Sequence, residues 1–152
     1  MNLTQIKKKV IAPPLASIGL GGDDAISLIA GTGLVESGYK YTQQLGGGPA
    51  LGWFQMEPAT HDDCWNNFLD YRPDLASKIR ALINGMTPTP HFLQTNAFYA
   101  VVMCRIKYLR APGVIPNTAQ GMADYHKEYY NTVLGKANAT ENIPFFQEAI
   151  DA

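Results

Sequence analysis

The sequence predicts a mainly α-helical protein with a small irregular hairpin or loop region. Apolar residues recur every three to four positions in several segments, and proline or a capping polar residue stands where several of these segments begin. The non-helical part is predicted at residues 38–57, which show no regular period and contain the run Gly46-Gly47-Gly48-Pro49. At 152 residues the chain fits one domain, 1–152, and folding at that size buries about 70% of the unfolded surface.

The first segment carries Lys7, Lys8 and Lys9 followed by an apolar stretch. We expect a short amphipathic helix that ends before Pro13-Pro14, because proline lacks a backbone donor and disfavours helix in the residue before it. A basic start followed by apolar residues is also typical of a secretory signal, but the proline pair interrupts this run near its middle. The helix is therefore preferred over a cleaved signal.

Residues 25–37 form the next predicted helix, with Asp23-Asp24 as its N-cap pair. At about 100° per residue, Ala25, Ile29 and Glu36 fall within roughly 20° of one direction. Glu36 is therefore expected to end an inward-facing stripe.

Five further helices are predicted along the chain. They start at Pro58, at Pro73 (ending before Asn84-Gly85), at Asn96 (running to Leu109 and apolar nearly all round), at Ala119 (with a stripe through Met122, Ala123, His126 and Tyr130) and at Asn142-Ile143-Pro144.

Composition excludes several classes of protein. The net charge of -1 gives no general attraction to nucleic acid or anionic membranes, and no apolar run reaches the ~18 residues of a membrane span. Cys64 and Cys104 have no partners at metal-binding spacing, and we expect free buried thiols in preference to a bridge. Phosphate binding by the glycine run is disfavoured, because the phosphate-loop pattern is absent.

The most informative stretch is residues 34–60. Glu36-Ser37 is followed by Gly52-Trp53-Phe54-Gln55 and then by Met56-Glu57-Pro58-Ala59-Thr60, and Tyr129-Tyr130-Asn131 comes later. In this order the four blocks resemble the signature of the lytic transglycosylase and goose-type lysozyme superfamily. Trp53 and Phe54 replace the middle pair of the second block, and Tyr129 replaces an alanine in the last. The resemblance runs from about Ala25 to Gly135 and includes the helix over residues 96–109.

The resemblance implies a lysozyme-like α+β fold, in one catalytic domain, that cleaves the β-1,4 bond between MurNAc and GlcNAc in peptidoglycan. It implies a monomer acting on glycan strands without a cofactor or metal, without nucleic acid and without stable membrane insertion. With no convincing export signal, the chain looks like a bacteriophage endolysin, held in the host cytoplasm before release to the wall, or a protein carried in the virion. The residues to which it assigns roles are Glu36 as the catalytic acid, and Ser37, Trp53, Gln55, Tyr130 and Asn131 as substrate-binding residues.

Glycosidic cleavage needs a proton on the departing oxygen, and a two-carboxylate hydrolase also needs a second acid about 5 to 10 Å away. Burial beside Leu28 and Ile29, under Trp53 and Phe54, would favour the neutral, proton-carrying form of Glu36. No Asp or Glu lies between Ser37 and Met56. This favours substrate-assisted chemistry, in which the sugar's acetamido group takes the place of the second acid and 1,6-anhydro ends form. A hydrolytic muramidase or a non-catalytic wall-binding module is the alternative.

Most of these residues also have a purely structural interpretation. Asp62 and Asp63 could supply the second acid or simply cap a helix. Gly31 and Gly33 could leave room for a sugar or allow close helix packing. The remaining alternatives are that Ser37 caps its helix, Gln55 fixes its loop, Tyr130 is a core residue, Asn131 caps its helix, and His126 is a packed core histidine.

Overall fold

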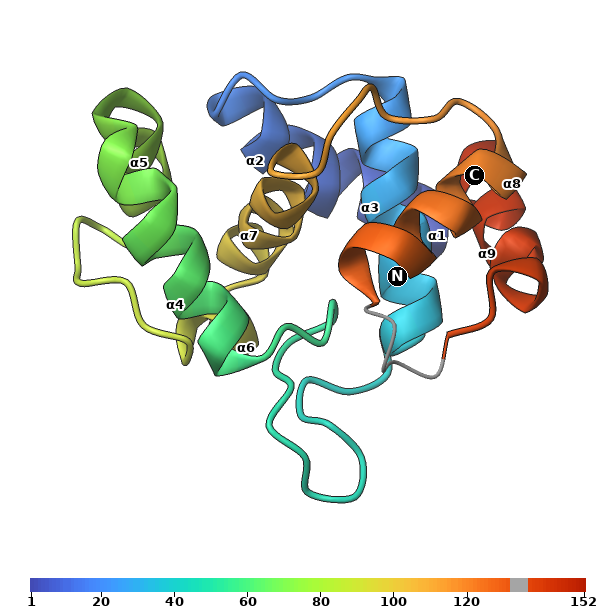
Figure 1. The fold of residues 1–152 in the computed structure, drawn as a ribbon, viewed down its shortest axis with the longest axis horizontal. Helices are drawn as coiled ribbons and strands as arrows, with labels where there is room; N and C mark the ends of the chain where they lie inside the picture. Colours follow the sequence, from blue (N-terminus) through green and yellow to red (C-terminus); the bar gives the residue numbers. More distant parts are fainter. Residues whose placement is uncertain (132–136) are drawn as a thin grey trace.

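The computed structural model describes residues 1–131 and 137–152, and this part of the protein is mainly helical, as predicted. In Figure 1, α4 (Pro58–Asn67) and α5 (Pro73–Ala81) lie on one side of α7 (Ala97–Leu109), and the remaining large helices lie on the other. The other elements are α1 (Leu3–Ile6), the π-helical turn η1 (Lys7–Ile11), α2 (Ala12–Ser17), α3 (Asp23–Glu36), the 3₁₀ turn η2 (Leu69–Tyr71), α6 (Phe92–Thr95), α8 (Ala119–Tyr125), the π-helical turn η3 (His126–Tyr130) and α9 (Ala139–Asp151).

The N-terminal helix does not end at the proline pair, so this prediction is wrong. The backbone stays helical from α1 through η1 into α2, where Pro13 and Pro14 occupy the first turn. In the π turn the N–H of Ala12 bonds to the carbonyl of Lys7, five residues back. The change from π-helical to α-helical bonding at Ala12 gives α2 a first turn of its own, and a first turn tolerates proline because its N–H groups need no partner there.

Helix α3 begins two residues before the predicted range and ends at Glu36. Gly22 is the N-cap residue, and Asp23 and Asp24 lie in the first turn without a side-chain capping bond, so their predicted N-cap role is wrong. In that position their negative charges still interact favourably with the positive end of the helix dipole. The inward-facing stripe is confirmed, since Ala25 and Ile29 are buried.

The two glycines of α3 serve close packing. A Cβ on Gly31 would overlap the ring of Phe146 in α9, and a Cβ on Gly33 would overlap the ring of Tyr39. Side chains of the protein itself therefore occupy the space that these glycines open, which leaves no room there for a ligand.

Helix α7 is the central helix that the sequence predicts. From Tyr99 to Cys104 every residue is buried, and Asn96 caps the helix by accepting a hydrogen bond from the N–H of Tyr99. The first turn departs from the prediction, because the side chain of Phe98 is 40% exposed. The helix contacts α2, α3, α4 and η3, so it joins the two sides of the molecule.

The C-terminal helices follow the prediction less closely. The stripe Ala119, Met122, Ala123, His126 and Tyr130 is buried as expected, but its last turn is π-helical. Helix α9 starts at Ala139, with Asn138 as its N-cap, and runs through Pro144. The predicted start at Asn142 is therefore wrong. The side chain of Asn138 caps the helix upstream, and Pro144 lies on the exposed face of the helix.

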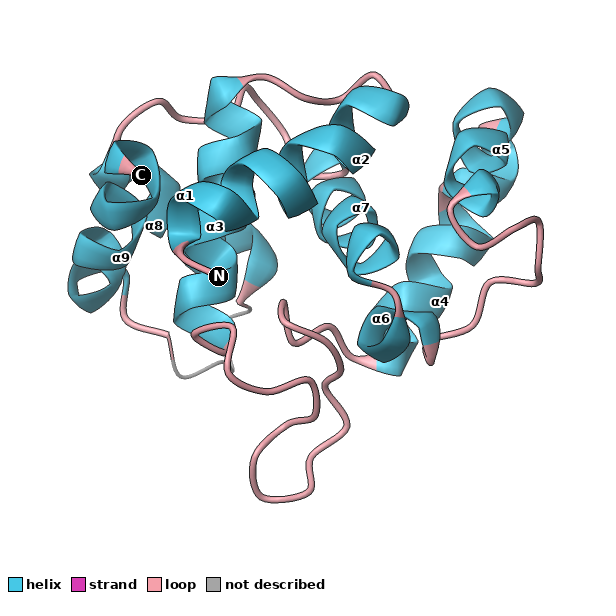
Figure 2. Ribbon diagram, turned by 180° about the vertical axis from the view of Figure 1, so that it is seen from behind, coloured by secondary structure: helices cyan, strands magenta, loops and turns pink. Residues whose placement is uncertain are grey.

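Residues 38–57 form the loop that projects at the bottom of Figure 1 and, seen from behind, of Figure 2. Within residues 1–131 and 137–152 there is no β-strand. The loop holds two isolated antiparallel bridges, between Gln43 and Leu51 and between Leu51 and Met56. The predicted irregular region is thus a loop whose hairpin is reduced to single bridges.

Both cysteines are free and buried, as predicted. Among the described residues, no helix combines the length and apolar character needed to cross a membrane.

Replacing Gly31 with alanine tests the close packing of α3 on α9. Alanine favours a helix interior over glycine by about 1 kcal/mol, but the added methyl group would displace the buried ring of Phe146, at a cost of about 1–3 kcal/mol. We expect the Gly31→Ala protein to have a lower free energy of unfolding in urea than the wild type. Gly21→Ala is the control, because a Cβ there has its nearest neighbour at an ordinary 3.7 Å. A more stable Gly31→Ala protein would contradict this packing.

Candidate functional site

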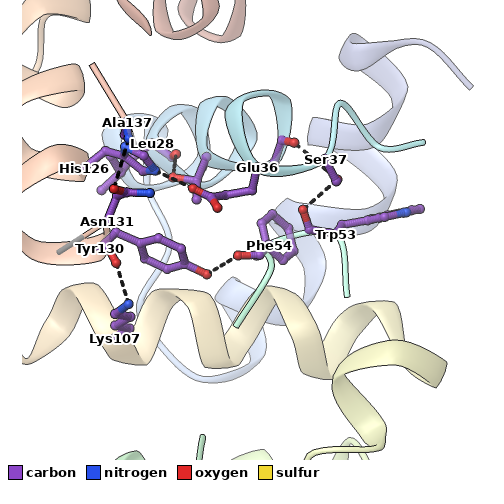
Figure 3. A network of polar contacts seen from close by, with 12 residues as sticks. Leu28, Glu36, Ser37, Trp53, Phe54, Lys107, His126, Tyr130, Asn131 and Ala137 are labelled. Carbon is purple, nitrogen blue, oxygen red and sulfur yellow. Dashed lines mark hydrogen bonds and ion pairs between the residues drawn. The ribbon is translucent and has the colours of Figure 1, made fainter. Parts of the chain in front are cut away.

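Glu36 lies at the last position of α3, where the helix meets the loop. Its side chain is only 15% exposed, and Oε2 lies 2.9 Å from Nε2 of His126. Its backbone carbonyl accepts a hydrogen bond from the Tyr41 hydroxyl at 2.9 Å. The candidate acid is therefore sheltered, and both its side chain and its backbone are held. Figure 3 shows the side-chain contact with His126.

His126 is the residue that the sequence interpretation missed. It is fully buried at the start of η3, as a core histidine would be, but its ring contacts the candidate acid. The ring stacks on Tyr130, with centroids 5.7 Å apart, and lies 5.8 Å from the ring of Phe146. The available signal was its position four residues before Tyr130, which places both on one helix face.

Tyr130 fastens the loop to the helices. Its buried hydroxyl donates to the backbone carbonyl of Phe54 at 2.6 Å, and burial raises the pKa of Tyr130 well above its ordinary value, so the donor stays protonated. Its ring stacks on Tyr108 of α7, and its carbonyl accepts from Lys107 Nζ at 2.6 Å. The Tyr130 hydroxyl thus binds the loop next to Glu36, whereas the carboxyl group of Glu36 pairs with His126.

Ser37 fixes the start of the same loop. Its hydroxyl donates to the carbonyl of Trp53 at 2.7 Å and accepts from the N–H of Tyr39 at 3.1 Å. The residue is 5% exposed and holds the C-cap position of α3. The position of Ser37 at the end of α3 agrees with the capping alternative. Its hydroxyl also holds the loop at Trp53, the residue before Phe54.

Three aromatic side chains pack beside the end of α3. Tyr39 lies edge-on to both Trp53, at 5.2 Å between centroids, and Phe54, at 6.2 Å. Phe54 is 2% exposed and belongs to the core, so of the two residues expected to cover the acid only Trp53, which is half-buried, has a solvent-facing side. The Tyr39 hydroxyl donates to the carbonyl of Ala30 at 2.9 Å, which locks this group onto α3.

The block Gly52-Trp53-Phe54-Gln55 is a tight turn. Gly52 has φ +77°, and a Cβ there would overlap the carbonyl of Leu93, so both conformation and space require glycine. Gln55 also has a positive φ, of 49°, and its side-chain amide donates to the carbonyl of Gly52 at 2.9 Å. Gln55 therefore fixes the loop, as its structural alternative predicts.

Asn131 follows η3 at its C-cap position and is half-buried. Its side-chain oxygen accepts from the N–H of Ala137 at 3.3 Å, and its own N–H donates to the carbonyl of His126 at 2.7 Å. This agrees with the helix-capping alternative. Thr132 and Gly135, which belong to the last part of the resemblance, lie outside the described residues.

The two aspartates considered as a second acid have other partners. Asp62 lies 2.9 Å from Nδ1 of His61, and Asp63 lies 2.7 Å from Arg110. Hydrogen bonds from Asn67 and then Arg110 hold the pKa of Asp63 below its ordinary value. Both carboxylates are therefore engaged on the α4 surface. Within the described part of the chain, no three His, Cys, Asp or Glu residues are grouped so that they could hold a metal ion.

The predicted residues thus fall into two sets. Glu36, Ser37, Trp53 and Tyr130 meet where α3, the loop and η3 come together. Gln55 and Asn131 bond to backbone groups of their own segments.

Comparisons with protein-family models, curated proteins and solved structures gave no match to this chain.

Replacing Tyr130 with phenylalanine tests the link between loop and helices. The change removes one hydroxyl and leaves the Phe54 carbonyl without its donor, which costs about 1–3 kcal/mol when the acceptor is buried. We expect that loss in the free energy of unfolding, measured by urea titration. Tyr71→Phe is the control, because Tyr71 is 77% exposed. Equal stability of the two variants would show that the bond does not hold the loop.

Proposed function

We propose that the protein cleaves the MurNAc–GlcNAc β-1,4 bond of peptidoglycan with Glu36 as its acid and base. The observation that carries the proposal is the state of this carboxyl group: sheltered at a helix end, bonded at Oε2 and with no hydrogen-bond partner at Oε1 among the described residues. A proton donor in a glycosidase needs such shelter together with one free oxygen. The ordered sequence blocks around Glu36 give the substrate class by resemblance.

The reaction we propose is substrate-assisted. Glu36 donates its proton to the glycosidic oxygen as the bond to the anomeric carbon breaks, and the neighbouring acetamido oxygen bonds to that carbon. The 6-hydroxyl oxygen of the same sugar then attacks the anomeric carbon, which breaks the bond from that carbon to the acetamido oxygen. The hydroxyl proton passes to Glu36, and a 1,6-anhydro end with a restored acetamido group remains. The absence of Asp and Glu between Ser37 and Met56 supports this route over a second carboxylate. So does the engagement of Asp62 and Asp63 with other side chains.

The lysozyme-like fold and the biological setting belong to the same proposal. We propose a single catalytic domain that acts as a monomer on glycan strands without a cofactor, with Trp53 offering its half-buried ring to a sugar. By analogy the protein serves a bacteriophage, as an endolysin or as part of the virion.

A non-catalytic wall-binding module is the second candidate. It is favoured by the bonds that tie Ser37, Gln55 and Asn131 to the chain's own backbone, because these groups are already occupied. Fold alone does not imply activity. Against it stands Glu36, a carboxyl group largely withdrawn from solvent in a position that a binding module does not need.

Replacing Glu36 with glutamine tests the catalytic proposal. Glutamine keeps the shape and can still bond His126 but carries no acid proton, so release of muropeptides from purified cell wall should fall by about 10²–10⁴-fold. Glu57→Gln is the control, because this acid is exposed at the start of α4. Unchanged lysis by Glu36→Gln refutes the assignment, and wall binding without lysis by the wild type favours the binding module.

The masses of the released muropeptides separate the two enzymatic outcomes. Substrate-assisted transglycosylation gives products lighter by one water than the reducing-end products of hydrolysis. We expect the anhydro products in mass spectrometry of a complete digest. Reducing ends at full mass would instead identify a hydrolytic muramidase.

A further inference from the structure

We infer that His126 is the positioning residue of Glu36, and that it decides which carboxyl oxygen carries the acid proton. The inference rests on the proposed function for its catalytic consequence. The hydrogen bond and the ring tautomer on which it depends can be tested without any activity.

The ring of His126 has little freedom. It is fully buried, stacks on Tyr130 at 5.7 Å with 20° between the planes, and lies 5.8 Å from the tilted ring of Phe146. Tyr130 is itself fixed by its bond to Phe54 and by its stack on Tyr108. A buried ring in contact with two other rings has little room to turn, and its Nε2 faces the carboxyl group of Glu36, as Figure 3 shows.

The hydrogen bonds of the ring determine its tautomer. A neutral imidazole carries one N–H, either on Nδ1 or on Nε2. Nδ1 is buried and has no hydrogen-bond partner among the described residues, whereas Nε2 lies 2.9 Å from Glu36 Oε2. A proton on Nδ1 would bury an unpaired donor, while a proton on Nε2 is satisfied by the carboxyl group. His126 is therefore the donor, and Oε2 is the acceptor.

This arrangement assigns the two oxygens of Glu36 different roles. Because Oε2 accepts from His126, the acid proton belongs on Oε1, which has no partner among the described residues. In the reaction the Oε1–H bond breaks, its proton moves to the glycosidic oxygen, and that oxygen leaves with the electron pair of the broken carbon–oxygen bond. His126 gains and loses no proton. Its N–H stabilises the carboxylate that remains and keeps Oε1 directed at the substrate.

Three substitutions separate this role from packing. His126→Phe keeps a ring of similar shape in contact with Tyr130 and Phe146 but removes the donor. His126→Gln keeps an amide donor at the reach of Nε2, and His126→Asn places its amide at the reach of Nδ1. With muropeptide release as the assay, we expect kcat to fall roughly 10- to 100-fold in His126→Phe, by analogy with the loss seen when the hydrogen-bond partner that orients a metal-binding side chain is removed. KM should stay within about twofold, since the substrate itself is not contacted.

Rescue by the matched amide is the decisive comparison. We expect His126→Gln to recover a large part of kcat and His126→Asn to recover none, with all three variants folded by circular dichroism. An unchanged kcat in His126→Phe would overturn the inference. So would equal activity of the glutamine and asparagine variants, because the position of the donor would then not matter.

The tautomer is measured directly by nitrogen-15 NMR of the histidine-labelled wild-type protein. We expect the His126 signals of a neutral ring protonated at Nε2, and faster exchange of that proton with water in Glu36→Ala. A proton on Nδ1 would overturn the inference. If the wild type cleaves no wall material, the proposed function fails, and this measurement still decides whether His126 donates to Glu36.

Discussion

The contact between Glu36 and His126 joins two helix ends that lie 90 residues apart in the chain. One partner closes α3 and the other opens the π turn after α8, so the contact exists only if α3, α8 and α9 pack in one register. Phe146 of α9 lies against both Gly31 and the His126 ring, and it therefore sets the distance between these helices. The geometry of the site is in this sense a consequence of helix packing.

Three hydroxyl groups around the site donate hydrogen bonds to backbone carbonyls and so hold the loop. Ser37 bonds the carbonyl of Trp53, Tyr130 bonds the carbonyl of the next residue, Phe54, and Tyr41 bonds the carbonyl of Glu36. Buried hydroxyl groups are costly unless paired, so each of these bonds stabilises one arrangement of the loop against others. A loop without strands is thereby fixed against the end of α3 by side chains from three segments.

This arrangement separates the residues that shape the site from the residue that would act in it. Ser37 and Tyr130 are buried and donate to backbone carbonyls, the side chain of Phe54 lies in the core, and Gln55 closes its own turn. Among the described residues Oε1 of Glu36 has no hydrogen-bond partner, and Trp53 keeps one side open to solvent. The proposed chemistry accordingly depends on few groups and on a rigid surrounding, as expected where a reacting group must be held within a fraction of an ångström.

Local features of the sequence are sufficient to predict the mainly helical class, the helices that start at Pro58 and Pro73, the central helix from Asn96, and the inward position of Glu36. These follow from local signals: a proline that fits a first turn, an asparagine that caps, and a spacing that places residues on one face. The tertiary structure decided what local signals leave open. Pro13 and Pro144 were misjudged as helix boundaries, because a π turn leads directly into the helix that contains Pro13 and because Asn138 caps α9 upstream of Pro144. His126 gave the sequence signal of a core residue. Only the packing of α8 and η3 against α3 made it a partner of the acid, because a contact between residues so far apart depends on the whole fold.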